Sequence, residues 1–288
     1  MVSQGHGKNG PARRHGENFP VASRLVRRDL RPLVLSFYDF ARAADDIADA
    51  PDTHPDVKLA QLDAAEAGLR GDGAGQAEAR ALAETLSQAG RVGTLRHAHA
   101  LLGAFRQDAG GIGTESWAEL MVYCEMSANP VGRFVLDIHD EPSGTREPSD
   151  ALCTALQILN HLQDLGADYR KLGRIYLPLD GAPPKDLAGD RLSPDLRAAV
   201  ARALDHTRPL LDEAAALPGR ISDRRLAGEV RAILTLAQGL HGALERGDPL
   251  ATRIAPGRRQ TAIAALRGLG EALRPRRSRA AIVVKDRA

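Results

Sequence analysis

Two acidic motifs are the part of the chain whose residue types and spacing could do chemistry. The first is Asp45-Asp46-Ile47-Ala48-Asp49, and the second extends from Asn160 to Asp168. Neither motif contains proline, so both are predicted to be helical, and residues four apart share a helix face. Asp45 and Asp49 would then lie one turn apart. The second motif would place three oxygen-bearing side chains on one face, from Asn160, Asp164 and Asp168.

Like charges at this spacing repel each other unless a cation neutralises them. Oxygen ligands on rigid helices suit Mg²⁺ that is shared with a phosphate group. The alternative interpretation is two solvated acidic faces. Apolar neighbours favour a site inside a helical bundle, because a solvated face does not need them; these are Phe40, Ala41, Ala43, Ala44 and Ile47 around the first motif and Leu156, Ile158, Leu159 and Leu162 around the second.

Further polar residues continue the two acidic faces. Tyr38 and Arg42 precede Asp45 at helical spacing, and Gln157 lies one turn before the second motif. Arg42 is a candidate to bind a diphosphate oxygen, or it pairs with a neighbouring aspartate. Arg174 follows the second motif and is the best candidate for a diphosphate contact, because its planar guanidinium can bind two oxygens.

A predicted helix over residues 114–136 is interrupted at Asn129-Pro130-Val131-Gly132. Pro130 removes a helical hydrogen bond, so we expect a kink there whose freed backbone groups face a cavity. Tyr123 lies just before this kink. Its hydroxyl could face the cavity, or it could be a core tyrosine bonded to the freed backbone.

The elements that must position these residues are all predicted to be helices. Aromatic residues make up only 3% of the chain, whereas alanine, leucine and arginine are abundant, and no strand-like alternation occurs. Ser149 is the predicted N-cap of the helix that carries the second motif. The predicted helices span residues 30–50, 57–69, 76–89, 95–108, 114–136, 149–169, 195–217, 222–246 and 258–273.

The predicted architecture is therefore one all-α domain over residues 17–273. Residues 1–16 are expected to form a disordered lead-in, because they are rich in glycine and cations and contain no apolar run. Residues 274–288 form a basic tail, which either attaches to an anionic membrane surface or serves only as a solubilising segment.

Composition excludes several functions. The net charge of +2 is too small to indicate a nucleic-acid partner, and no apolar run reaches the ~18 residues that a bilayer span needs. Two cysteines far apart in sequence fit a reducing cytoplasm. We expect a cytoplasmic protein whose membrane contact, if any, is peripheral on the cytoplasmic face of the inner membrane. The oligomeric state is not predicted.

Three ordered segments resemble the squalene and phytoene synthase family, and the resemblance covers about residues 17–250. Residues 37–49 look like its first aspartate-rich motif, residues 157–178 like its second motif with the following flap, and residues 123–133 like its helix break. The resemblance implies a helical bundle around a central apolar cavity. It also implies Mg²⁺ ions and site residues in three roles: Asp45, Asp49, Asn160, Asp164 and Asp168 for the metal; Asn18, Arg42, Gln157 and Arg174 for the diphosphate; Tyr123 and Tyr38 near the reacting carbons.

Within this family, residues 17–23 and 127–133 are similar to the hydroxysqualene synthases of bacterial hopanoid biosynthesis. This branch implies that presqualene diphosphate and water give hydroxysqualene and diphosphate, without NADPH. One alternative is the condensation of two prenyl diphosphates, and another is a catalytically silent lipid-binding or scaffolding relative. The chain departs from the family pattern at Gly110-Gly111-Ile112-Gly113, at Glu125 and at His161.

Overall fold

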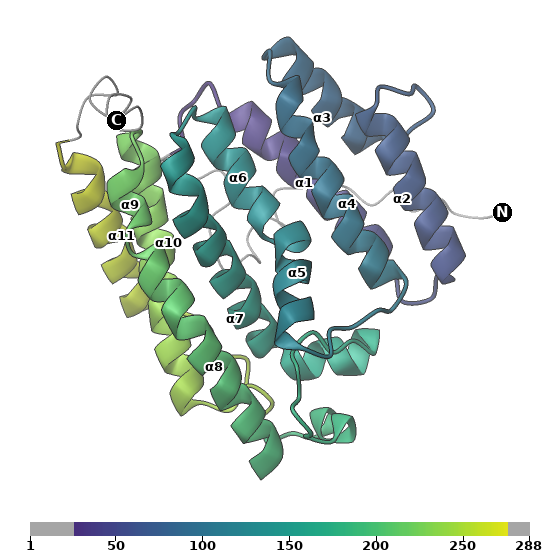
Figure 1. Cartoon of the computed structure of the whole chain (residues 1–288), viewed down its shortest axis with the longest axis vertical. Coiled ribbons are helices and arrows are strands. Elements are labelled where there is room, and N and C mark those ends of the chain that lie inside the picture. The colour runs from purple at the N-terminus through teal and green to yellow at the C-terminus, as the bar shows by residue number, and fades with distance from the viewer. Residues whose placement is uncertain (1–25, 276–288) are drawn as a thin grey trace.

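The computed structural model describes residues 26–275, in which every regular element is helical (Figure 1). This confirms the predicted all-α class. Short 3-10 turns lie at Val92–Thr94, Ser143–Thr145 and Pro184–Ala188. The α-helices are α1 (Arg31–Ala48), α2 (Pro55–Leu69), α3 (Ala77–Gln88), α4 (Leu95–Ala109), α5 (Trp117–Ser127), α6 (Asn129–Ile138), α7 (Arg146–Leu172), α8 (Pro194–Ala214), α9 (Leu217–Arg220), α10 (Arg224–Arg246) and α11 (Arg258–Leu273).

The predicted break in the helix over residues 114–136 is confirmed. It lies at Ala128, where φ is −119° and ψ is −50°, and it separates α5 from α6. Pro130 sits in the first turn of α6, where a backbone N–H has no helical partner to lose. The Ser116 side chain caps α5 by accepting from the Glu119 N–H at 3.3 Å.

The N-cap predicted for the helix with the second motif is wrong. Helix α7 begins at Arg146, and Ser149 is a buried residue in its first turns. Pro148 lies between them, in the first turn of the helix. Its missing N–H costs little there, because the first four N–H groups of a helix have no intrahelical partner.

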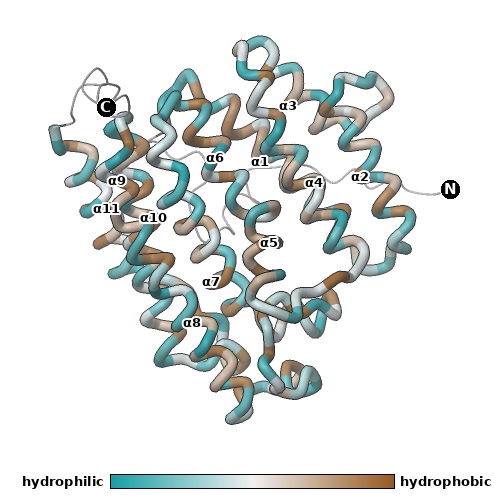
Figure 2. The backbone as a smooth tube through the Cα atoms, viewed as in Figure 1, coloured by the Kyte–Doolittle hydropathy of each residue, from teal (hydrophilic) through white to brown (hydrophobic). Residues whose placement is uncertain are grey.

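Two clusters of buried apolar side chains form the interior. One cluster is formed by side chains of α1, α2, α3 and α4 with part of α6, and it includes Phe40, Leu62 and Leu102. The other joins α5, α7, α8 and α10 and includes Leu159 and Leu240. Figure 2 shows the hydrophobic and hydrophilic residues alternating along these helices, as one-sided burial requires.

The two acidic motifs belong to different clusters. Helix α1 packs mainly on α2, α3 and α4, whereas α7 packs mainly on α6, α8 and α10. Figure 1 shows α1 to α4 on one side of the molecule and α8 to α11 on the other, with α5 to α7 between them. The motifs are thus carried to the boundary between two separately packed groups of helices.

The predicted chain ends mostly fall outside the described range. The lead-in over residues 1–16, the site candidate Asn18 and all but the first two residues of the basic tail lie there, and the predicted domain bounds stay predictions. Among the helices of residues 26–275, none has the length and apolarity to cross a membrane.

Candidate active site

The first acidic motif closes α1. Asp45 lies in the last turn, and Asp49 is the C-cap residue, whose N–H donates to the Asp45 carbonyl at 2.9 Å. Burial and then the charge of Asp49 raise the pKa of the Asp45 carboxyl to about 7. The repulsion that the spacing predicts is therefore present in the folded chain.

Arg42 pairs with the aspartates of its own helix. Its Nη1 donates to Asp45 Oδ2 at 2.9 Å, and its Nη2 lies 3.3 Å from Asp46 Oδ1. The sequence left two roles open for Arg42, and the structure shows the pairing with neighbouring aspartates. A diphosphate contact by Arg42 stays a prediction. Tyr38 is half-buried one turn earlier on α1.

The second motif lies on α7, with Asn160, Asp164 and Asp168 all half-buried. The pKa of Asp168 is raised to about 7, first by burial, then by the charge of Asp164 and then by that of Asp49. The charge of Asp49, at the end of α1, therefore acts on a carboxyl group of α7. The two acidic faces therefore share one electrostatic environment although their helices pack in different clusters.

Arg174 is the cation that bridges the two motifs. Gly173 ends α7 in the left-handed region with a φ of 67°, so the chain turns back and Arg174 reaches α1. There its Nη1 donates to the Asp49 carboxylate and to the Tyr176 hydroxyl, the latter at 3.0 Å, and its Nη2 donates to the Ala48 carbonyl at 2.7 Å. The Arg174 side chain is only 9% exposed.

Tyr123 is held by an acid that sequence analysis did not select. Its hydroxyl donates to Asp108 Oδ2 at 3.0 Å and to Oδ1 at 3.3 Å, rather than to backbone freed at the helix break. Asp108 lies on α4 and is buried, and burial raises its pKa to about 6 against the lowering effects of Arg174 and the Tyr123 hydrogen bond. One signal was available, because Asp108 continues the apolar face of Leu101 and Ala104 at helical spacing.

Three rings lie beside this acid. His161 stacks on Tyr176 with centroids 4.1 Å apart, and the Tyr123 ring lies 5.5 Å from that of Tyr176. Burial lowers the pKa of His161 to about 3, so the imidazole is neutral and its Nε2 accepts from the Gln157 amide at 3.2 Å. His161 therefore behaves as a flat, neutral packing group, and the Gln157 side chain is directed to it.

Asp164 has a partner from a distant segment. Arg253, in the connection between α10 and α11, donates through Nε to Asp164 Oδ1 at 3.1 Å. Both side chains are partly exposed, at 51% and 37%. No local pattern in the sequence predicts this contact, because the two residues are 89 positions apart.

An open groove of about 1060 Å³ adjoins Arg174, between the segments 111–115 and 173–179. The glycine segment noted in the sequence forms part of its wall. A side chain at Gly113 would place its Cβ 2.8 Å from the Ile175 carbonyl oxygen, so glycine allows these two segments to pack closely. Glu125, another departure from the family pattern, is exposed on α5. The expected central apolar cavity stays a prediction.

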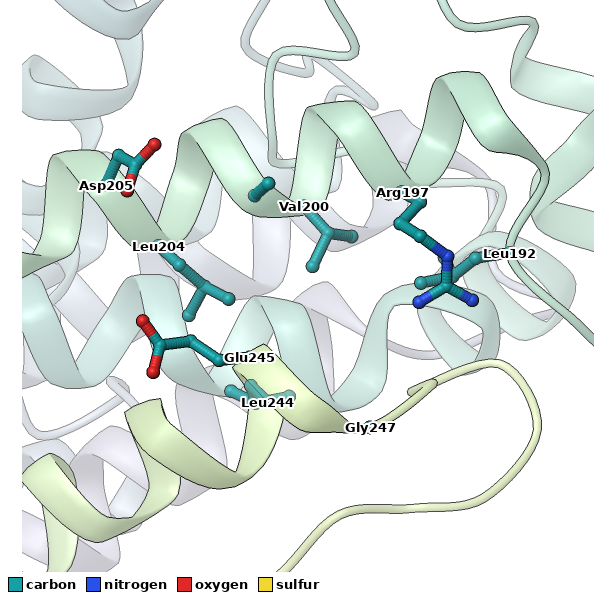
Figure 3. Close-up of a pocket in the computed structure, with 9 residues that line it drawn as sticks. Leu192, Arg197, Val200, Leu204, Asp205, Leu244, Glu245 and Gly247 are labelled. Carbon is teal, nitrogen blue, oxygen red and sulfur yellow. The ribbon is translucent and has the colours of Figure 1, made fainter.

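A second hollow of about 200 Å³ lies between α8 and the end of α10 (Figure 3). Arg197 stands at one end of it and Asp205 and Glu245 at the other. Arg197 pairs with Asp248 at 3.3 Å, and Glu245 pairs with Arg208 at 2.6 Å. None of its lining residues comes from either acidic motif, so this hollow is not the candidate active site.

The acidic residues fit a metal that is shared with a substrate. In the described range, 26–275, no three His, Cys, Asp or Glu side chains gather closely enough to hold an ion by themselves. Mg²⁺ commonly binds through one or two carboxylates together with substrate phosphates and water. Carboxylates carried by α1 and α7, with pKa values raised by burial and by neighbouring carboxylates, suit such an arrangement.

Comparisons with known proteins agree with this geometry. Residues 12–267 match the squalene/phytoene synthase family. A hydroxysqualene synthase of Zymomonas mobilis is 43% identical over 83% of this chain and 82% of its own length, and one of Rhodopseudomonas palustris is 44% identical over 88% of each chain. The crystal structure of a squalene synthase from Alicyclobacillus acidocaldarius superposes with a TM-score of 0.68 at 34% identity, covering 78% of this chain and 87% of that one.

Proposed function

Because the chain belongs to the squalene/phytoene synthase family, we propose that it converts presqualene diphosphate and water to hydroxysqualene and diphosphate. The observation that carries the proposal is its likeness to hydroxysqualene synthases over more than four fifths of both chains. The chain is an enzyme of this family and not the silent relative considered above.

The two acidic faces would hold the metal. In this proposal Asp45 and Asp49 on one side and Asn160, Asp164 and Asp168 on the other would hold Mg²⁺, which would supply positive charge to stabilise a diphosphate leaving group. Arg174 would orient the diphosphate beside Asp49. The support is its buried position between the motifs and the several donors of a guanidinium group.

The chain must also control the carbocation that remains. Loss of diphosphate breaks a C–O bond and leaves a cyclopropylcarbinyl cation, which rearranges, opens and takes up water with loss of a proton. In this proposal Tyr123 and Tyr38 lie near the reacting carbons, with Tyr123 fixed by Asp108. An apolar environment around them would exclude other water molecules.

One assay separates this reaction from its rival in the same family. Purified protein is incubated with Mg²⁺ and either presqualene diphosphate or farnesyl diphosphate, without NADPH, and the lipid products are identified by mass spectrometry. We expect hydroxysqualene from presqualene diphosphate and no C30 product from farnesyl diphosphate. If farnesyl diphosphate gave a C30 product and presqualene diphosphate gave no hydroxysqualene, the chain would be assigned to head-to-head condensation instead.

The lipid character of these molecules also suggests where the protein acts. Presqualene diphosphate and hydroxysqualene carry long hydrocarbon chains and partition into bilayers. We therefore propose that the enzyme works in peripheral contact with a membrane, and the low cysteine content supports the cytoplasm as its compartment.

A further inference from the structure

Helix α11 directs its large apolar side chains away from the protein. Leu266, Leu269 and Leu273 are 70%, 54% and 66% exposed, and Ile263 is 40% exposed. Their spacing of three or four residues places them on one face, within an arc of roughly 120° at about 100° per residue. A solitary exposed leucine is ordinary, but a continuous exposed face indicates a surface that binds something.

The opposite face of α11 fixes the helix to α10 through small residues. A Cβ on Gly228 of α10 would lie 2.7 Å from the Gly268 oxygen, and one on Gly268 would lie 2.6 Å from the Gly228 oxygen. Ala264 is buried on this same side. The two backbones touch, so no leucine could be accommodated between them, and the orientation of α11 follows from this close approach.

Charged contacts lock the same orientation. Arg224 of α10 donates to the Ala272 and Leu273 carbonyls, each at 2.9 Å, and so satisfies the C-terminal end of α11. Arg231 of α10 lies 3.3 Å from Glu271, which is buried. The exposed apolar face is therefore a fixed feature, and rotation of the helix about its axis would break these bonds.

The charges beside the apolar face are positive. Arg258, Arg259, Arg267 and Arg274 are all exposed, whereas Glu271, the acid of this helix, is buried on the α10 side. An apolar face edged by arginines without exposed acids is the pattern of a helix that lies in the headgroup region of an anionic bilayer. A partner surface of this kind supplies both hydrocarbon and negative charge.

We propose that the exposed face of α11, formed by Ile263, Leu266, Leu269, Leu273 and the flanking arginines, docks on an anionic lipid bilayer. Among the described elements α11 packs extensively only on α10, and Figure 1 shows it at the outer edge of the molecule. Its preceding connection carries Arg253, which contacts Asp164. The docked helix therefore directly follows, along the chain, the segment that touches the second acidic motif.

Vesicle co-sedimentation tests the proposal without substrate, so its outcome is independent of the proposed reaction. The full chain is mixed with vesicles of phosphatidylglycerol and phosphatidylethanolamine, or of phosphatidylcholine alone. We expect binding to the anionic vesicles, weakened by 0.5 M NaCl, and a loss of roughly tenfold in Leu266→Gln/Leu269→Gln, since each change removes exposed hydrocarbon. The control Val57→Gln/Val92→Gln, at similarly exposed positions on other elements, should bind like the wild type.

Three results would overturn the proposal. Equal binding by wild type and Leu266→Gln/Leu269→Gln would exclude α11 as the contact. Weakened binding after deletion of residues 276–288, but not after the leucine substitutions, would assign the contact to the basic tail. Sedimentation equilibrium without lipid gives the third: a dimer that the leucine substitutions dissociate, in a protein that does not bind vesicles, would assign the face to a second copy of the chain.

Discussion

Asp108 is the buried carboxylate that holds the Tyr123 hydroxyl. It accepts from Tyr123 and stands near Arg174, whose charge favours the ionised form. With a pKa of about 6, it is mostly ionised at neutral pH. A fixed negative charge beside Tyr123 would hold the phenol in one orientation and would favour a nearby carbocation electrostatically.

Asp108→Asn tests this role. The amide oxygen can still accept from Tyr123, but the charge is lost, so we expect turnover to fall by roughly tenfold or more. The midpoint of thermal unfolding at pH 7.5 should be unchanged or higher, because a buried charge has been removed. Tyr123→Phe is the companion variant, and the double variant should lose little more than either single one, because the two residues act as a unit. Full activity of Asp108→Asn would show that the acid is structural only.

At the level of elements, the end of α7 determines where Arg174 lies. Gly173 adopts a φ of 67°, which lets the chain reverse so that the guanidinium meets the end of α1. An L-residue with a Cβ adopts this conformation at a cost of about 1 kcal/mol. A change at Gly173 thus acts both on stability and on the geometry of the bridge between the acidic motifs.

Gly173→Ala should lower the free energy of unfolding by about 1 kcal/mol and reduce turnover several-fold, as measured by urea unfolding and product release. Gly90→Ala provides a matched control, because Gly90 has the same φ of 67° after the end of α3. The control should show the loss of stability without the loss of turnover. Equal activities in the two variants would mean that the turn does not position Arg174 for catalysis.

At the level of the whole molecule, the acidic cluster lowers stability when no metal is bound. Asp45, Asp108 and Asp168 have pKa values raised to about 7, 6 and 7 from the usual 3.8. At these three carboxyls the folded chain therefore binds more protons than the unfolded chain between about pH 4 and pH 7. These carboxyls stabilise the fold most at low pH, and their contribution is lost as pH rises through the folded-state values.

Asp45→Ala should accordingly become more stable relative to the wild type as the pH rises from 4 to 7, in urea unfolding without Mg²⁺, while turnover is abolished. The difference between the two proteins is the quantity to follow, because His161, with its pKa lowered to about 3, shifts the absolute stability in the opposite direction. Asp164→Ala should also lose turnover but change stability by less than about 1 kcal/mol, since its pair with Arg253 is exposed. A marked loss of metal-free stability at pH 7 in Asp45→Ala would show that this aspartate is structural.

The sequence by itself determined the helical class and the faces of the acidic motifs. Helices α1, α4 and α11 begin and end within two residues of their predicted bounds, because apolar periodicity, proline and glycine are local signals. The same periodicity placed Asp45 with Asp49 and Asn160 with Asp164 and Asp168. Family membership followed from the same motifs, which occur in order along the chain.

Tertiary structure decided which side chains meet. Arg174 contacts Asp49, which is 125 positions away in the sequence, and Arg253 contacts Asp164, which is 89 positions away. Asp108 accepts a hydrogen bond from the Tyr123 hydroxyl, which belongs to another helix. Such partners depend on how separately packed helices are brought together, which local periodicity does not encode. The outward leucines of α11 have the same origin: the contact of Gly228 with Gly268 fixes the helix, and packing between two backbones selects the small residues as the inner face.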